Sequence, residues 1–137
     1  MSLEVPKKLK REINRLARNY PEKRSASLMV LHALQEEFGY ISPEAEEWAA
    51  ARLGLQPINI HELVTFYPML REHDPGRTVV RVCRTLSCAL AGSHKLHRHI
   101  CDTLGLNANG HGLQRTTDGK YGVEYAECLA SCGTGPV

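Results

Sequence analysis

The sequence lacks any long apolar segment. Its hydrophobic residues are interrupted by polar and charged ones well before the ~18 consecutive apolar residues that a membrane-spanning helix needs. No apolar stretch of the kind that directs secretion occurs near its beginning. Without such a signal, the five cysteines favour a reducing compartment, where thiols bind metals or take part in redox chemistry. We therefore expect a cytoplasmic protein with no membrane span.

Motifs for catalysis and nucleotide binding are also missing. There is no P-loop and no H-E-x-x-H, and the two G-x-G fragments at residues 110–112 and 133–135 have no strand–GxGxxG–helix context. There is no C-x-x-C pair, which thiol–disulfide enzymes carry at a helix N-terminus. We therefore expect no complete active site in this chain and no site for a dinucleotide or a flavin.

Positive charge is concentrated near the start of the sequence. Residues 1–24 carry eight basic and three acidic side chains, although the whole chain has a net charge of only +2. Such a segment can contact nucleic acid, anionic lipid or an acidic partner subunit, but the plainer interpretation is the polar face of an amphipathic helix. A DNA-binding regulator would need a recognition helix rich in exposed Arg, Lys, Asn or Gln, which residues 59–67 do not provide, so we expect no nucleic-acid partner.

Helical signals dominate residues 1–70. Apolar residues recur at helical spacing between Pro6 and Pro21, and again before Gly39, which suits a helix C-terminus. Ser42 followed by Pro43 is a typical helix start, and a fourth helix is expected to begin at Asn59. Four short helices in this length predict a small helical bundle.

The remainder of the chain has a mixed pattern. Residues 71–77 form a charged turn with a Pro-Gly core, which we interpret as a linker between a bundle at 1–70 and a second domain at 78–137. Valine-rich residues 78–83 predict a buried strand, and residues 89–104 predict one helix. Asp118-Gly119 predicts a two-residue hairpin turn between strands at 113–117 and 120–127.

Four of the five cysteines occur as two close pairs. Cys83 and Cys88 form a C-x4-C pair, and Cys128 and Cys132 form a C-x3-C pair. Two such pairs on separate loops are typical of a soft metal centre bound by thiolates. Spacing alone leaves zinc and a [2Fe–2S] cluster about equally open, because zinc pairs most often have the spacing C-x2-C and the plant-type ferredoxin spacing is absent as well.

The remaining candidate ligands have simpler interpretations. Cys101 belongs to neither pair and is expected to be a buried structural thiol. His94, His97 and His99 lie close together on the predicted helix, and the first two are one turn apart, so they could reach a metal. Histidines in such positions are more often surface residues or satisfied polar groups.

A resemblance to a known family is carried by four sequence blocks. They are V-T-F-Y at residues 64–67, C-x4-C-x3-G at 83–92, T-x-D-G at 116–119 and E-C-L-x-x-C-x-x-x-P at 127–136. Together they resemble the NuoE-like family, the thioredoxin-like [2Fe–2S] subunit of the NADH-dehydrogenase module of respiratory complex I. Related subunits occur in NAD-linked hydrogenases and formate dehydrogenases. The resemblance covers nearly the whole chain.

The resemblance implies an α/β fold (α+β overall), in which an N-terminal helical bundle is followed by a thioredoxin-like [2Fe–2S] ferredoxin domain. It implies one [2Fe–2S] cluster held by Cys83, Cys88, Cys128 and Cys132. It also implies an electron-transfer role in a multi-subunit NADH:quinone oxidoreductase, beside a larger flavoprotein subunit that binds NADH and FMN. The complex would lie on the cytoplasmic side of the inner membrane. Arg81 and Arg84, on either side of Cys83, are the expected charged residues that tune the potential.

Two positions depart from the family pattern. The family often has glycine where this chain has Ala130, and we expect the methyl group to fit if the local φ is negative. Family members also continue beyond the position of Val137 into another strand and usually a helix, so we expect the domain here to lack both.

Rival functions remain open on the residues alone. A zinc-stabilised interaction module would use the same four cysteines, and an NAD-linked hydrogenase or a formate dehydrogenase could contain the same kind of chain. Metal content and redox spectroscopy separate the first rival from an iron–sulfur protein.

Overall fold

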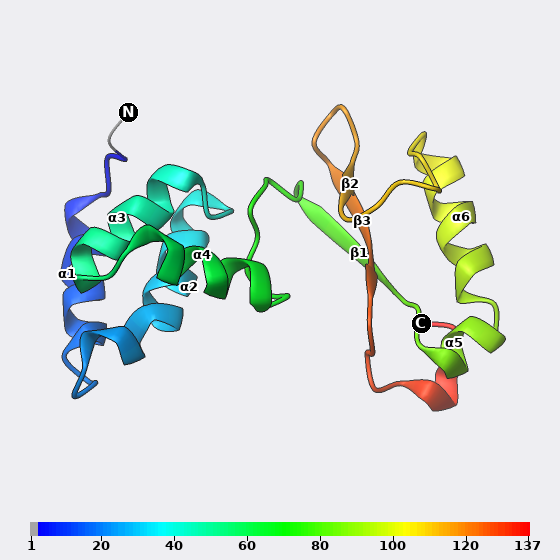
Figure 1. Ribbon diagram of the computed structural model, residues 1–137. Helices are drawn as coiled ribbons and strands as arrows, with labels where there is room; N and C mark the ends of the chain where they lie inside the picture. The colour runs from blue at the N-terminus through cyan, green and yellow to red at the C-terminus, as the bar shows by residue number, and fades with distance from the viewer. Residues whose placement is uncertain (1–2) are drawn as a thin grey trace. The chain divides into compact units, whose positions relative to one another are not determined.

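The computed structural model describes residues 3–137, which form two compact units (Figure 1). The first unit ends at Asp74 and the second comprises Pro75–Val137, so the division falls within residues 71–77. The Arg71 carbonyl accepts a hydrogen bond from the Ile41 N–H, which ties that end of the segment to the first unit. At the other end, the Arg77 N–H donates to the Gly119 carbonyl in the second unit.

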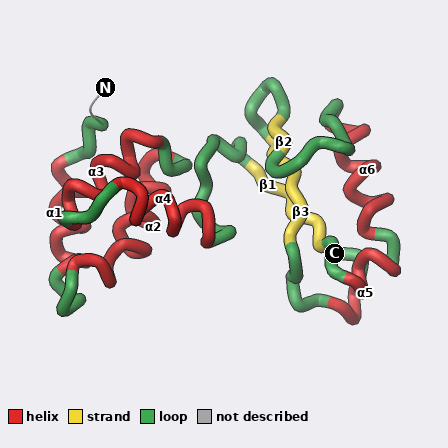
Figure 2. Tube along the Cα trace, in the orientation of Figure 1, coloured by secondary structure: helices red, strands yellow, loops and turns green. Residues whose placement is uncertain are grey.

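Among residues 3–74, all the regular secondary structure is helical, and loops connect the helices (Figure 2). Its elements are α1 (Lys7–Ala17), the 3-10 turn η1 (Lys23–Ala26), α2 (Ser27–Phe38), α3 (Pro43–Leu53) and α4 (Pro57–Phe66). Ser42 caps α3 by accepting a hydrogen bond from the Ala45 N–H, and Gly39 ends α2 in the left-handed conformation, as the sequence predicts. No helix among residues 3–137 is long and apolar enough to cross a bilayer.

Helix α4 begins earlier than expected. It starts at Pro57 rather than after Asn59, because proline suits the first helical turn. The Asn59 side chain then reaches back to accept a hydrogen bond from the Gln56 N–H at 3.3 Å. Asn59 therefore contributes to the start of the helix from its third position.

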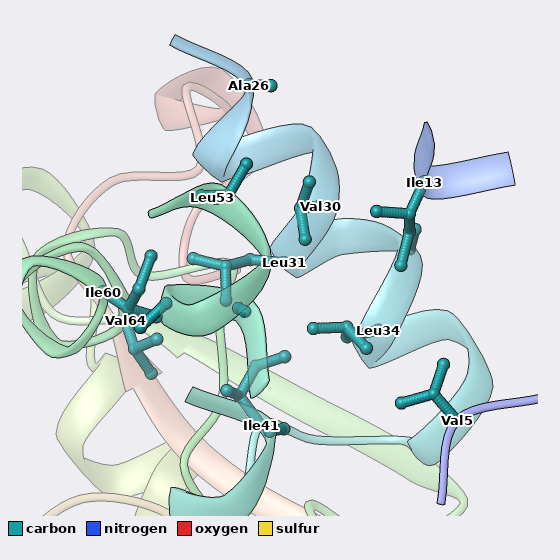
Figure 3. Packing of buried hydrophobic residues seen from close by; sticks show 14 of the residues in the cluster. Val5, Ile13, Ala26, Val30, Leu31, Leu34, Ile41, Leu53, Ile60 and Val64 are labelled. Carbon is teal, nitrogen blue, oxygen red and sulfur yellow. The ribbon is translucent and has the colours of Figure 1, made fainter. Parts of the chain in front are cut away.

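The core of this unit is aliphatic (Figure 3). The fully buried side chains come from all four helices and include Ile13 of α1, Leu31 and Leu34 of α2, Ala49 of α3 and Ile60 of α4. Burial of apolar surface at ~25 cal/mol per Å² is the main term that stabilises such a bundle.

The second unit combines a small sheet with helices. Its elements are β1 (Thr78–Cys83), α5 (Leu86–Leu90), α6 (Ser93–Leu104), β2 (Gln114–Arg115), β3 (Tyr121–Ala126) and the 3-10 turn η2 (Cys132–Thr134). The strand order is β1-β3-β2, with β1 parallel and β2 antiparallel to β3. Helix α6 contacts both β1 and β3 and is the crossover between these parallel strands.

Two expectations for this unit are wrong in detail. The single helix expected at residues 89–104 is two helices, because Gly92 takes a positive φ of 104° and separates α5 from α6. The hairpin turn is longer than two residues, since the strands stop at Arg115 and resume at Tyr121. The Asp118 carboxylate accepts from the Thr116 hydroxyl at 2.6 Å and from the Lys120 N–H at 3.0 Å, which holds the longer loop.

A glycine in the central strand provides a test of the packing. A Cβ atom on Gly122 would collide with the Pro75 carbonyl oxygen and press on the Leu113 side chain. We expect Gly122→Ala to lower the free energy of unfolding by about 1–3 kcal/mol, the usual cost of overpacking. Denaturant unfolding followed by circular dichroism measures the change. The matched control is Gly133→Ala, whose Cβ would meet no atom within 4 Å; equal effects of the two substitutions would contradict the packing argument.

Candidate metal centre

The parallel pairing of β1 and β3 determines where the cysteines lie. Cys83 is the last residue of β1 and is paired with Ala126, the last residue of β3. Both strands therefore end at the same edge of the sheet. Cys88 follows within α5, whereas Cys128 comes two residues after β3 and Cys132 begins η2. All four cysteines thus lie at this edge or on the two loops that leave it.

Direct contacts join these two loops. The Cys83 sulfur lies 3.4 Å from the Glu127 carbonyl oxygen, and the Cys83 N–H donates to the Val137 carbonyl at 2.7 Å. A Cβ atom on Gly135 would lie 3.4 Å from the Cys88 sulfur, so the chain passes close to this thiol where it has no side chain. Figure 1 shows the red C-terminal segment returning to α5. The structure therefore brings the two cysteine pairs to one place.

The two pairs differ in exposure. Cys83 and Cys88 are 2% and 1% exposed, whereas Cys128 and Cys132 are exposed to solvent. Cys101 is fully buried in α6, and its sulfur lies 3.7–3.8 Å from the ring nitrogens of His97. Its surroundings agree with a structural thiol.

The Cys83 thiol ionises more easily than an ordinary thiol. The Thr85 hydroxyl, 3.1 Å from the sulfur, and the Thr85 N–H stabilise the thiolate and lower the Cys83 pKa to about 7, against the opposing effect of burial. For Cys88, the Val137 N–H lowers the pKa, but the hydrogen bond with Cys83, burial and the nearby thiolates of Cys83 and Cys132 together raise it. Metals bind the thiolate form of cysteine, and within this pair Cys83 is the residue that loses its proton first.

The loop after Cys128 contains a strained residue. Ala130 has a φ of +53°, in the left-handed region that favours glycine, so the condition under which its methyl group was expected to fit, a negative φ, is not met. In this conformation the Ala130 N–H points to the Cys128 sulfur at 3.4 Å. The backbone turn that strains Ala130 therefore also supplies a donor to a cysteine sulfur.

Charged residues near the cysteines are paired. Arg84 forms a salt bridge with Glu127, and its guanidinium lies 5.9 Å from the centre of the Tyr125 ring. Arg81 binds Glu124 at 2.8 Å, across the register of β1 and β3. Arg81 and Arg84, which the sequence predicts to tune the potential, therefore each have a carboxylate partner. This pairing reduces the positive charge that they present to the cysteines.

Two histidines of α6 contact Tyr125 of β3. His97 is 2% exposed and stacks on Tyr125 with ring centres 3.9 Å apart, and His94 lies 3.3 Å from the Tyr125 hydroxyl. Their contacts anchor α6 to β3. His99 is exposed on the same helix.

The donor set fits a [2Fe–2S] cluster. A [2Fe–2S] cluster distributes its four thiolates over two irons, so the sulfurs need not meet at one point. Four thiols on two adjoining loops, with N–H and hydroxyl donors at the sulfurs, fit this requirement.

The sequence did not identify all the residues that shape this site. Thr85, Gly135 and the backbone of Val137 contact the cysteine sulfurs or hold Cys83 in place. Of these, only Gly135 had a recognisable signal, because a glycine in a ligand loop permits close approach.

Comparison with known proteins adds a family and several relatives. The family model described as thioredoxin-like [2Fe–2S] ferredoxin matches residues 13–137. An NADH-quinone oxidoreductase subunit of Aquifex aeolicus is 33% identical, over 98% of this chain and 81% of its own length. A subunit of the same type of oxidoreductase from Thermus thermophilus is 38% identical, over 85% of this chain and 63% of its own length. The NADP-reducing hydrogenase subunit HndA of Solidesulfovibrio fructosivorans is 23% identical, over 97% of this chain and 75% of its own length.

The strain at Ala130 leads to a prediction. A non-glycine residue in the left-handed conformation costs ~1–2 kcal/mol, which Ala130→Gly would remove. Glycine loses more conformational entropy on folding, which offsets part of this gain, so we expect the substitution to stabilise the protein by up to about 1 kcal/mol. Unfolding midpoints in denaturant measure the change. Ala91→Gly is the matched control. Ala91 has an ordinary φ of −76°, so this substitution should destabilise the protein. A lower midpoint for Ala130→Gly would contradict the assignment of strain.

Proposed function

The chain belongs to the thioredoxin-like [2Fe–2S] ferredoxin family, and we propose that it is an electron-transfer subunit of an NADH:quinone oxidoreductase. In this proposal Cys83, Cys88, Cys128 and Cys132 hold one [2Fe–2S] cluster. The observation that carries it is the convergence of both cysteine loops at one edge of the sheet. When bound, the cluster accepts and releases one electron at a time.

The protein residues have distinct roles in this function. The β1–β3 pairing keeps the two loops in register, and the surrounding protein shields Cys83 and Cys88 from water. The Thr85 hydroxyl and the Ala130 N–H donate toward sulfur, which stabilises negative charge that grows on reduction. In this proposal, hydride transfer from NADH takes place on another subunit, a flavoprotein that binds NADH and FMN.

The parent complex is supported by the names of the relatives. Two relatives above 30% identity are subunits of NADH-quinone oxidoreductases, which favours that assembly. The hydrogenase subunit at 23% identity favours a second candidate, the same electron-transfer role in an NAD(P)-linked hydrogenase. A cytoplasmic location, with attachment to the membrane through partner subunits, is part of the first proposal. Purifying the chain together with its bound partner subunits distinguishes the two assemblies. Copurified quinone oxidoreductase subunits would identify the first, and copurified hydrogenase subunits would identify the second.

The ligand assignment is tested by replacing cysteines one at a time. Cys128→Ser should reduce the iron content from about two atoms per chain to well under one, and it should remove the EPR signal seen after dithionite reduction, because serine is a harder ligand than thiolate. Cys101→Ser is the matched control and should retain both iron and signal. Full iron content in Cys128→Ser would remove Cys128 from the ligand set. One zinc per chain without iron in the wild-type protein would establish the zinc module instead.

The electrostatic role of Arg84 is tested by the reduction potential of the cluster. Arg84→Glu places a negative charge beside the cluster, and we expect the potential to fall by on the order of tens of millivolts at low salt. Arg77→Glu makes the same charge change before the opposite end of β1 and should shift the potential less. A redox titration followed by EPR measures both. Equal shifts for the two variants would show that the position of Arg84 has no special influence.

A further inference from the structure

A cavity in the helical unit is lined by three basic side chains. Arg18 directly follows α1, Lys23 begins η1, and Arg52 lies in the last turn of α3. The cavity has a volume of about 470 Å³, which is within the usual range of small-molecule binding sites. Its lining residues all come from the first unit, so its shape is set by the packing of that unit alone.

The positive charge of this cavity is not neutralised by carboxylates. No Asp or Glu is among the lining residues that the structure describes, and Glu22, next to Lys23 in the sequence, is not one of them. Within residues 3–137, Arg18 and Lys23 form no ion pair. Arg52 donates to the side-chain carbonyl of Asn14, a neutral acceptor that orients the guanidinium and leaves its charge uncompensated.

Other basic residues of the chain are paired instead. Arg24, the residue after Lys23, binds Glu62 at 3.3 Å, and Lys120 binds Asp118 at 3.4 Å. A cation with a structural role in this protein is thus commonly matched by a carboxylate. The three cations of the cavity differ from this pattern.

Helix dipoles explain only part of the arrangement. The negative end of a dipole attracts a cation near a helix C-terminus, which applies to Arg18 after α1 and to Arg52 in α3. This attraction does not require the two side chains to share a cavity with Lys23, where like charges repel one another. Three cations around one cavity are better explained by an anion that balances their charge.

The rest of the cavity wall is largely apolar. Ile13 and Leu53 belong to the hydrophobic core and are 0% and 4% exposed, and Tyr20 and Pro21 complete this part of the lining. Small-molecule sites typically combine such apolar walls with a few placed polar groups. The site therefore suits an anionic group at the basic side chains and a less polar body against the ring of Tyr20.

We propose that this cavity binds a small molecule that carries a diphosphate group, with Arg18, Lys23 and Arg52 holding the phosphates. Guanidinium groups bind phosphate oxygens in pairs, and lysine contributes a point charge. Three cations exceed the charge of a single phosphate group, which favours a diphosphate. Binding by side chains needs no glycine-rich loop, so the absence of a P-loop and of G-x-G-x-x-G is compatible with this site. The helical unit contains none of the cysteines, so the site is independent of the proposed cluster.

Isothermal titration calorimetry of the full cluster-loaded chain tests the site, with ADP and inorganic diphosphate as probes. Both should bind, ADP more tightly, whereas adenosine should not bind because it has no phosphate. Arg18→Gln and Arg52→Gln should each raise the dissociation constant for ADP by about tenfold, the usual order for a lost hydrogen bond between charged groups. Arg11→Gln is the matched control. Arg11 is an exposed cation of α1 outside the cavity, so its variant should bind like wild type.

Two further measurements separate the cavity from other causes. Circular dichroism should be unchanged in each variant, because the substituted arginines are exposed. Arg18→Lys keeps the charge and should lose less affinity than Arg18→Gln. Iron content should be the same before and after titration, since diphosphate can also chelate iron.

Several outcomes would overturn the proposed site. Equal weakening by Arg11→Gln and Arg18→Gln would indicate attraction to the overall charge of residues 1–24 rather than binding in the cavity. Failure of wild type to bind either probe at millimolar concentration, or loss of iron that accounts for the heat, would have the same consequence. Equal affinity for ADP and inorganic diphosphate would exclude the contact with Tyr20. None of these results changes the assignment of the cluster ligands, which the cysteine variants test separately.

Discussion

The parallel pairing of β1 with β3 is the constraint on which the site depends. Parallel strands end at the same edge of a sheet, so the loops that follow them begin side by side whatever their length. The register places Cys83 opposite Ala126, and the Arg84 N–H continues the ladder to the Ala126 carbonyl at 2.9 Å. Antiparallel pairing would have sent the two cysteine loops to opposite ends. The helical crossover through α6 is therefore as necessary to the site as the cysteines.

Helix α6 is held to the sheet by an aromatic contact rather than by aliphatic packing alone. His97 stacks on Tyr125 of β3, and burial lowers the pKa of His97, which keeps its ring neutral near neutral pH. Because α6 follows Cys88 and Tyr125 precedes Cys128, this stack links the segments that carry both cysteine pairs. The three histidines that suggested a possible metal site in the sequence thus include a structural contact of the domain.

Local chemistry made much of the fold predictable, whereas the site's finer geometry depended on tertiary contacts. Ser42 and Gly39 mark helix ends through their own hydrogen bonding and backbone preference, so the helices could be placed from the sequence. Gly92 broke an apparently continuous helix because a glycine there can adopt either hand of φ, which the sequence does not reveal. The positive φ of Ala130 could not be predicted from the sequence either, because alanine rarely adopts a positive φ. The cysteines themselves were found by spacing, but zinc and iron were separated only by resemblance.

The scarcity of charged residues in both cysteine loops connects the chemistry of the site to its surface. A thiolate cluster is anionic, and Arg84, the basic residue between Cys83 and Cys88, is already paired with Glu127, so dipoles near the sulfurs contribute to its stabilisation. The hydrogen bonds from the Ala130 N–H and from Thr85 serve this purpose, and the first of them requires the strained turn at Ala130. Charged side chains could stabilise sulfur without strain, but they would have to be desolvated whenever another protein covered the loops. Backbone N–H donors cost less to desolvate than charged side chains when another protein covers the loops. The strain at Ala130 therefore comes with a surface that a partner can approach closely.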